Sequence, residues 1–270
     1  MKTARVLPVL MYHHVSRSPG LVTVSPENFR AQMQDLANAG WHTVSSTEIA
    51  DFLAGGSLPK RSVAITFDDG YLDNYVHAFP VLREFGLRAT LFAVTGWVSD
   101  GPARKISDDV VLPDHRGCKA AISAGQPDEV ILRWSEIETM QAEAVIEVHS
   151  HTHTHSRWDK LISDQTERQN ALAEDLTNSR INLQKRLGLT DSHLCWPQGY
   201  FDDDYVSVAL SCGFKYLYTT RRRMNYHNSP ATRIGRIDTR DKGAGWLVPR
   251  LDLYTTPVLG DVYCHLRGGR

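Results

Sequence analysis

Two adjacent carboxylates stand at the end of an apolar run and are the first residues that could do chemistry. The run from Val63 to Phe67 leads into T-F-D-D-G, residues 66–70, which contains Asp68 and Asp69. Adjacent carboxylates in a turn after a strand point in different directions, so one could bind a metal ion while the other acts as a base. The alternative is a surface turn, because Asp and Gly favour turns for local reasons. The pair alone favours that alternative.

A cluster of histidines follows a second apolar run further along the chain. Residues 147–155 read E-V-H-S-H-T-H-T-H, with four histidines at alternate positions. Neutral imidazole is a common ligand of divalent metals. His151 and His155 share a face if the segment turns helical, whereas all four share a face if it stays extended. A histidine-rich surface loop is the alternative, but the position after a strand favours a metal site.

A third motif, C-W-P-Q-G at residues 195–199, is a rigid turn whose backbone N–H groups can face a pocket. Alone, it is more simply a structural turn. Together, one Asp and two His form a three-ligand metal set with open positions, which is the catalytic pattern. A free carboxylate beside it could deprotonate water, and backbone N–H groups could hold an oxyanion. The combination predicts a hydrolase that acts on a carbonyl carbon.

The elements that must position these motifs alternate between strand and helix. We expect short buried strands, separated by helices, over residues 6–11, 63–67, 89–94, 145–148, 194–196 and 216–219. This alternation predicts a parallel sheet or barrel, whose sites lie at the carboxyl ends of the strands. We expect one domain over residues 1–270, with a loop insertion at 99–130 and an irregular tail at 241–270.

Composition narrows the class of protein and of partner. The chain has 270 residues, of which 41% are hydrophobic, as is typical of a globular domain. Its formal net charge is -1, so it has no overall positive charge that would favour binding to nucleic acid. The four cysteines form no C-x-x-C pair, so they predict neither a zinc knuckle nor a redox motif. The first apolar run is too short for a signal sequence, and no run is long enough to span a membrane. We therefore expect a cytoplasmic protein.

The ordered motifs resemble the polysaccharide deacetylase family, which has a NodB-homology domain (carbohydrate esterase family 4). T-F-D-D-G resembles its first motif, H-T-H-T-H at residues 151–155 matches H-[ST]-x-x-H, and C-W-P-Q-G stands where R-x-P-x-G is usual. The opening L-M-Y-H-H-V and the segment W-S-E-I look like the poly-N-acetylglucosamine deacetylase branch. The resemblance covers about residues 5–240 and implies an α/β fold, a distorted (β/α)7-type barrel.

The resemblance also implies roles for individual residues. Asp68 would be the general base, and the backbone N–H of Gln198 would help to hold the oxyanion. The expected metal ligands are Asp69, His151 and His155. The expected substrate contacts are Pro197, Gly199 and Tyr200. Zinc is the metal expected first, with Co²⁺, Ni²⁺ or Fe²⁺ as alternatives, while His149 and His153 would flank the site.

Two departures from the family pattern concern the groups that support the base. Cys195 replaces the arginine that steadies the base in the family, and either Arg233 or Arg236 could substitute, although a surface role is equally open for both. The family's late L-x-L-H motif supplies a histidine acid. The sequence V-Y-C-H, which ends at His265, is a loose match to it, and His13 is a rival for which a buried structural role is the better interpretation.

The resulting hypothesis is a metal-dependent N-deacetylase of an acetylated amino sugar. Because no signal sequence is visible, a nucleotide-linked or lipid-linked intermediate or a short oligosaccharide is the expected substrate, with peripheral membrane contact if it is lipid-linked. Trp97, Trp134 and Trp158 could stack on sugars, although core packing is the alternative for each and is favoured for Trp134. The alternative functions are hydrolysis of a non-sugar amide on the same fold and a non-catalytic carbohydrate-binding relic.

Overall fold

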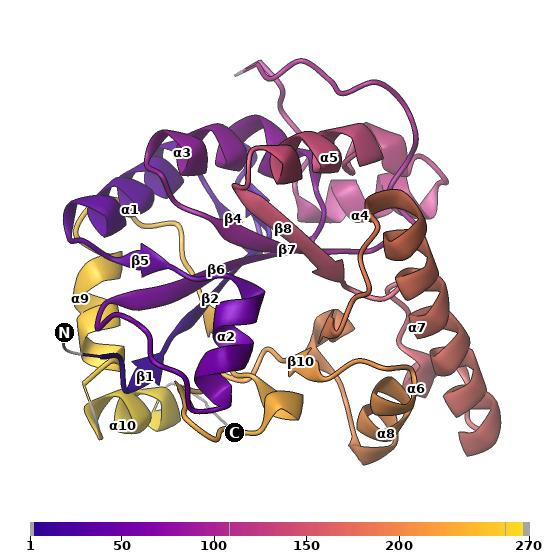
Figure 1. Ribbon diagram of the computed structural model, residues 1–270. Helices are drawn as coiled ribbons and strands as arrows, with labels where there is room; N and C mark the ends of the chain where they lie inside the picture. The colour runs from indigo at the N-terminus through magenta and orange to yellow at the C-terminus, as the bar shows by residue number, and fades with distance from the viewer. Residues whose placement is uncertain (1–2, 108, 257, 267–270) are drawn as a thin grey trace.

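A curled parallel sheet forms the centre of the molecule (Figure 1). This computed structural model describes residues 3–107, 109–256 and 258–266. Within these, the main sheet runs in the order β10-β9-β8-β7-β6-β2-β12, with β5 also paired to β6. Its strands are β2 (Val9–Tyr12), β5 (His42–Thr43), β6 (Ser62–Asp69), β7 (Ala89–Ala93), β8 (Ile146–Ser150), β9 (His193–Cys195), β10 (Tyr216–Tyr218) and β12 (Ile237–Asp238). All of their pairings are parallel, which confirms the predicted α/β class.

The two ends of this sheet approach each other, so the sheet resembles an incomplete barrel. Ile234 lies just before β12 and bridges in parallel to Tyr218 of β10, at the far edge. The Ile234 N–H donates to the Leu217 carbonyl at 2.9 Å, and the Thr219 N–H donates to the Ile234 carbonyl at 3.0 Å. This curl brings the segment around β12 across the interior toward β6.

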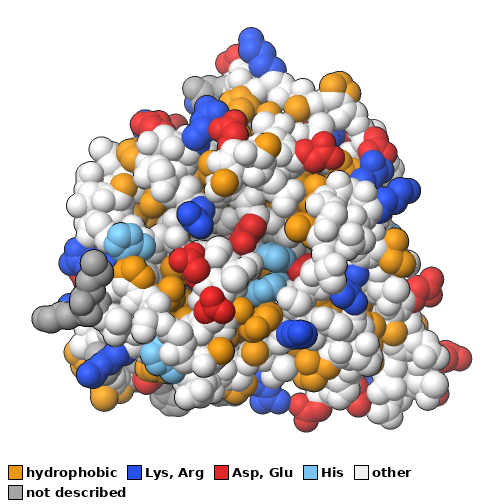
Figure 2. Space-filling model, in the orientation of Figure 1, with side chains coloured by type: hydrophobic (Ala, Val, Ile, Leu, Met, Phe, Trp, Pro, Cys, Tyr) orange, Lys and Arg blue, Asp and Glu red, His pale blue; other side chains and the backbone are white. Residues whose placement is uncertain are grey.

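Helices cover the outside of the sheet (Figure 1). They are α1 (Pro26–Asn38), α2 (Ser46–Leu53), α3 (Phe79–Glu84), α5 (Trp134–Ala142), α6 (Trp158–Leu161), α7 (Gln165–Leu187) and α8 (Asp203–Ser211). Every residue of β6 is buried, as expected for a strand covered on both faces. No described helix is both long enough and apolar enough to cross a membrane. Figure 2 shows acidic and basic side chains interspersed on the face drawn there, without a large field of one sign.

Short elements complete the chain and refine several predicted boundaries. The expected first strand is split at Pro8, which has no backbone N–H to donate, into β1 and β2. The helical segment between β6 and β7 begins with one π-helical turn before α3. The short elements are β1 (Val6–Leu7), β3 (His14–Val15), β4 (Thr23–Val24), β11 (Asn225–Tyr226), the π turn Asn74–Ala78, and the 3-10 turns Pro127–Glu129, Pro197–Gly199 and Ala231–Arg233.

The expectation of irregular structure at residues 241–270 is wrong for the part that the structure describes. This segment contains α9 (Leu247–Tyr254) and α10 (Leu259–Leu266). Leu247, Leu251 and Tyr254 recur at helical spacing and are buried, and α9 packs on α1. Helix α9 is therefore stabilised by an apolar stripe that becomes buried where α9 packs against the distant helix α1. The single-domain boundaries remain a prediction.

The predicted insertion at 99–130 contains helix α4 (His115–Ser123) and is held to α5 by a buried ion pair. Glu136 is fully buried and accepts hydrogen bonds from the backbone N–H and the Nε of Arg104 at 2.9 and 2.8 Å. The Arg104 guanidinium also donates to the carbonyls of Asp128 and Ile131, both at 2.6 Å. One arginine therefore fixes two distant parts of the insertion.

Removal of the Glu136 side chain should destabilise the fold much more than removal of a carboxylate from an exposed ion pair. Glu136→Ala leaves the Arg104 charge without its buried partner, and we expect a loss of about 3–5 kcal/mol in the free energy of unfolding. The control is Glu143→Ala, which breaks the exposed pair with Arg83 and should cost less than about 1 kcal/mol. Urea unfolding of both variants measures the difference, and equal losses would contradict the anchoring role of Glu136.

Candidate active site

The candidate site lies where neighbouring parallel strands end. β6 ends at Asp69, β8 ends just before His151, and β9 ends at Cys195. Because β6, β7, β8 and β9 are adjacent and parallel, their carboxyl ends meet at the same edge of the sheet. The three motifs are thus brought together by the sheet.

Asp69 faces two imidazoles, as the metal assignment requires. Its Oδ1 lies 3.3 Å from Nε2 of His151 and 3.3 Å from Nε2 of His155. Ligands about 2.0–2.1 Å from a tetrahedral ion lie roughly 3.3 Å apart, so this spacing fits zinc. The Asp69 Oδ1 atom is buried and accepts no hydrogen bond of good geometry from the described residues. A buried carboxylate oxygen without a donor is the expected partner of a cation.

The orientation of His151 is set by the strand beside it. Its Nδ1 lies 2.8 Å from the carbonyl oxygen of Cys195, which can only accept, so Nδ1 carries a proton and Nε2 is the atom that a neutral ring would offer to a cation. A backbone carbonyl that fixes the tautomer of a metal-binding histidine is a common outer contact in metal sites.

His155 reaches the same point through an irregular loop rather than a helix or an extended strand. Thr152 and His155 have φ values of 66° and 59°, the left-handed region that β-branched and bulky residues seldom adopt. The His155 N–H donates to the Thr152 hydroxyl at 3.0 Å. Neither backbone shape considered from the sequence therefore describes this segment, although two of its histidines do face one carboxylate.

Asp175 of α7 anchors this strained loop. Its Oδ1 accepts from the backbone N–H groups of His153 and Thr154, both at 2.8 Å, and its Oδ2 accepts from the indole N–H of Trp158 at 2.9 Å. Asp175 is itself buried. Trp158 therefore helps to hold the loop through its indole N–H, and sugar stacking on its ring remains a prediction.

The other two histidines of the cluster are engaged elsewhere. His149 Nδ1 lies 2.7 Å from Oδ1 of Asp191, and its Nε2 lies 2.9 Å from the Ser46 hydroxyl. His153 Nδ1 lies 3.0 Å from the Thr95 hydroxyl. Both flank the Asp69 cluster without joining it.

Asp68 is held by a buried arginine. The Arg236 guanidinium donates to Oδ1 and Oδ2 of Asp68 at 2.6 and 2.7 Å, and its Nε donates to the Thr219 carbonyl at 2.9 Å. Burial acts to raise the pKa of Asp68, but the charge and hydrogen bonds of Arg236 outweigh it, so the pKa lies below its usual value. Asp68 is therefore an ionised carboxylate with a fixed orientation.

Arg236, rather than Arg233, thus stands beside Asp68, the predicted base. Arg233 is exposed and pairs with Asp203 at 3.0 Å. Cys195 faces the same carboxylate, with its Sγ 3.7 Å from each oxygen, and accepts from Arg236 at 3.0 Å. The thiol occupies the place next to Asp68 where the family motif has an arginine, and the guanidinium comes instead from the segment before β12.

A second set of potential ligands, Asp68, His151 and Cys195, lies within reach of one ion. Arg236 already occupies both oxygens of Asp68. Burial is the largest influence on the pKa of Cys195 and raises it, which favours the neutral thiol, a poor ligand. The set around Asp69 is therefore the better cation site.

Two adjacent histidines near β2 and β3 have different carboxylate partners. His13 Nε2 lies 3.7 Å from Oδ2 of Asp68, and its side chain is 17% exposed. Its neighbour His14 is the buried structural histidine, with Nδ1 2.7 Å from Asp73 and its ring stacked on Tyr71. A structural role therefore describes His14, and the same interpretation of His13 remains a prediction.

The insertion also contributes to this region, through a residue that the sequence did not indicate. His115, at the start of α4, lies with Nδ1 3.2 Å from Nε2 of His14 and 3.5 Å from the Tyr71 hydroxyl. Burial lowers the pKa of His115 to about 4, so the ring is neutral. No sequence signal links residues 101 positions apart, which explains the omission.

The turn after β9, which the sequence predicts to be rigid, has a strained backbone. Gln198 has a φ of 55° and Gly199 a φ of 69°, and a Cβ on Gly199 would lie 1.9 Å from the Thr220 hydroxyl, so only glycine fits there. The Arg157 guanidinium lies 4.0 Å from the Tyr200 ring centroid. The roles of Pro197, Gln198, Gly199 and Tyr200 toward a substrate remain predictions.

The remaining predicted residues are placed less directly. His265 lies in α10, but its side chain falls outside the described residues, so its role as the acid remains a prediction. Trp134 is buried in the core, as favoured. Trp97 lies with its ring centroid 5.2 Å from that of His155, so it borders the candidate metal ligands, and its stacking role remains a prediction.

Known proteins resemble this chain in sequence and in architecture. The chain matches the polysaccharide deacetylase family over residues 55–217, more than half of its length. The poly-beta-1,6-N-acetyl-D-glucosamine N-deacetylase of Staphylococcus aureus is 25% identical over 230 residues, which cover 85% of this chain and 72% of that protein. YxkH of Bacillus subtilis is 42% identical over 89 residues, so the match spans only 32% of YxkH.

Solved structures agree with this match. IcaB from Ammonifex degensii superimposes with a TM-score of 0.71 at 26% identity, over 87% of this chain and 92% of that one. A de-N-acetylase from Aggregatibacter actinomycetemcomitans has a TM-score of 0.71 at 22% identity, over 91% and 99% of the two chains, and shows the fold alone. These similarities confirm the predicted fold and enzyme class, a carbohydrate deacetylase. The chain belongs to the polysaccharide deacetylase family.

Proposed function

We propose that this protein is a divalent-metal-dependent hydrolase that removes acetyl groups from N-acetylglucosamine units of a glycan. The observation that carries the proposal is the pairing of two carboxylates with different surroundings. Asp69 faces two Nε2 atoms at 3.3 Å, and Asp68 is clasped by Arg236. The names of its relatives, which act on poly-beta-1,6-N-acetyl-D-glucosamine, supply the substrate class.

The residues that would hold the metal are Asp69, His151 and His155, with zinc expected first and Co²⁺, Ni²⁺ or Fe²⁺ as alternatives. The chemistry that such an ion supplies when bound is polarisation of a carbonyl oxygen and a lower pKa of a nearby water. Two nitrogen ligands and one carboxylate form a common catalytic set, with further positions left for water and substrate.

Asp68 has the properties of the general base. It is ionised because of Arg236, and its bidentate contact fixes the direction of its oxygens. In the proposed reaction Asp68 takes a proton from the attacking water as the water oxygen bonds to the acetamide carbon. The Gln198 N–H, presented by the strained turn, donates to the oxyanion that forms.

Collapse of the tetrahedral intermediate breaks the carbon–nitrogen bond and releases acetate, and the amine takes up the proton that Asp68 received. His13 lies 3.7 Å from Asp68 and is the described histidine placed to pass this proton on. Burial is the largest influence on the pKa of His13 and lowers it, so the free ring is neutral and can accept the proton first. His265 remains the sequence-based candidate for the same task.

The form of the substrate separates the remaining hypotheses. The names of the relatives favour a polymer or its oligosaccharides, whereas the sequence-based expectation of a cytoplasmic protein favours a nucleotide-linked or lipid-linked sugar, with membrane contact in the latter case. Two further hypotheses are hydrolysis of a non-sugar amide and carbohydrate binding without catalysis. A panel of N-acetylated oligosaccharides, nucleotide sugars and simple amides, assayed for acetate by mass spectrometry, discriminates among them.

Substitutions in the two carboxylate environments should separate catalysis from metal binding. Asp68→Asn should retain the metal and lose acetate release by about 10²–10⁴-fold in kcat, because the base is gone. His151→Ala should lose both the bound metal, measured by elemental analysis, and the activity. The control is Asp252→Asn, at an exposed position, which should change neither. An active Asp68→Asn variant would show that Asp68 is not the base.

The proposed role of Arg236 predicts a defect in turnover without loss of metal. Arg236→Lys retains a positive charge but loses the fork that grips both oxygens of Asp68, so kcat should fall at least about tenfold while KM and metal content stay close to wild type. Arg233→Lys, on the exposed side of the same segment, is the matched control. If both lysine variants behaved like wild type, the orientation of Asp68 would not depend on Arg236.

A further inference from the structure

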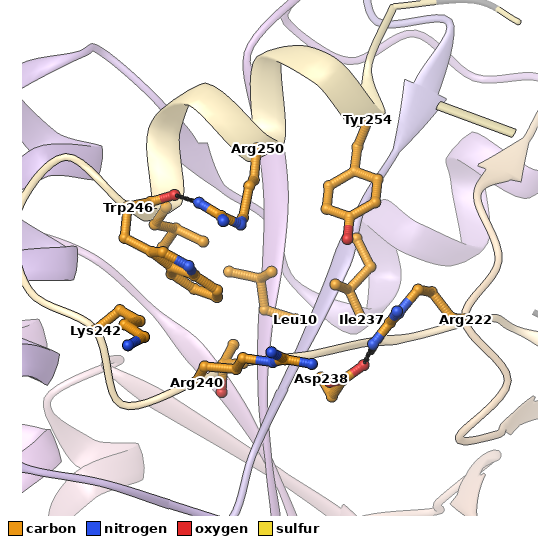
Figure 3. Close-up of a pocket in the computed structure, with 11 residues that line it drawn as sticks. Leu10, Arg222, Ile237, Asp238, Arg240, Lys242, Trp246, Arg250 and Tyr254 are labelled. Atoms are coloured by element: carbon orange, nitrogen blue, oxygen red, sulfur yellow. Dashed lines mark hydrogen bonds and ion pairs between the residues drawn. The ribbon is translucent and has the colours of Figure 1, made fainter. Parts of the chain in front are cut away.

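A cavity lies on the side of β12 that faces away from Asp68. Its volume is about 170 Å³, and it lies between the edge of the sheet and α9 (Figure 3). Leu10 of β2 and Ile237 of β12, which are paired in register, form its floor. Arg236, one residue before Ile237, points to Asp68 instead, as alternation along a strand requires. This cavity is therefore separate from the candidate active site.

The lining of this cavity is strongly basic. It contains the basic side chains of Arg222, Arg240, Lys242 and Arg250 against the single acidic side chain of Asp238, which is a surplus of three positive charges. Arg222 donates to Asp238 from its Nε at 3.1 Å. No hydrogen bond or ion pair joins the side-chain nitrogens of Arg240 or Lys242 to another described residue. Two cations therefore remain available beside the cavity (Figure 3).

Hydrogen bonds from α1 and the residue before it fix the backbone of the loop that carries Arg240 and Lys242. The buried amide of Gln32 in α1 donates to the carbonyls of Arg240 and Lys242 at 3.0 and 2.6 Å. Between them, Oδ1 of Asp241 accepts from the Ser25 hydroxyl at 2.8 Å and from the Asn28 amide at 2.6 Å. A backbone fixed in this way reduces the entropy that a ligand must overcome to order the site.

The opposite wall is aromatic. The Arg250 guanidinium lies over the Trp246 ring, 4.5 Å from its centroid, and donates to the Trp246 carbonyl at 2.8 Å. Figure 3 shows Tyr254 of α9 on the same wall as Arg250, above Leu10 and Ile237. The cavity thus combines an apolar floor, an aromatic wall and a basic rim, which are complementary to an anion with a small ring or apolar body.

We propose that this cavity binds a phosphate monoester whose ring or apolar body lies on Leu10, Ile237 and Trp246. A phosphate monoester carries a charge of about −1.5 to −2 at neutral pH, which matches the basic surplus better than the single charge of a carboxylate. Arg240 and Arg250 supply planar donor groups, and Lys242 a point charge, for its oxygens. The ligand has two sources, a soluble phosphorylated metabolite or the headgroup of a phospholipid.

Calorimetric titration of the full chain with phenyl phosphate, inorganic phosphate and benzoate tests the proposal. Phenyl phosphate should bind more tightly than either of the others, because only it has both the ring and the phosphate. The double variant Arg240→Gln/Lys242→Gln should weaken phenyl phosphate at least about tenfold, while Arg233→Gln, a basic residue outside the cavity, should not. Unchanged thermal unfolding will show that both variants are folded.

Co-sedimentation with phosphatidylcholine vesicles, with and without phosphatidic acid, separates the two sources. Binding only to vesicles that contain phosphatidic acid, lost in the double variant, would support the site with a lipid source. The proposal would be overturned if the wild type bound neither phenyl phosphate nor these vesicles, or if it bound benzoate as tightly as phenyl phosphate. It would also be overturned if Arg233→Gln weakened binding as much as the double variant does. These outcomes do not depend on deacetylase activity.

Discussion

Adjacent buried carboxylates repel each other, and burial makes the cost of two negative charges higher still, so an arrangement that keeps both ionised must compensate each one. The guanidinium of Arg236 compensates Asp68 through two hydrogen bonds. Asp69 turns away at a φ of 74° and faces the Nε2 atoms of His151 and His155, where a cation fits. The division of labour between the carboxylates depends on this one buried ion pair.

The curl of the sheet makes that ion pair possible. The strand order places β12 beside β2, while Ile234 reaches across to β10, so the segment between them delivers Arg236 to the end of β6. The helices provide a second layer of support. Asp175 of α7 fixes the histidine loop through backbone N–H groups, so the geometry at Asp69 depends on contacts well outside the cluster.

Features encoded locally could be predicted from the sequence. The strands before Asp68 and His151 were evident because apolar, β-branched runs end abruptly in polar motifs, and the parallel arrangement followed from the alternation of strands with helices. The choice between Arg233 and Arg236 could not be made, since both lie in one short segment and only the curl of the sheet decides which one turns inward. The approach of His115 and the formation of α9 likewise depend on packing between segments far apart in sequence.

Anomalous X-ray scattering from crystals of the zinc-loaded protein would test the division of labour most directly. The account predicts a peak about 2.0–2.2 Å from the side chains of Asp69, His151 and His155, with Asp68 still bound to Arg236. A peak surrounded by Asp68, His151 and Cys195 would contradict it, because the carboxylate assigned as base would then be the metal ligand.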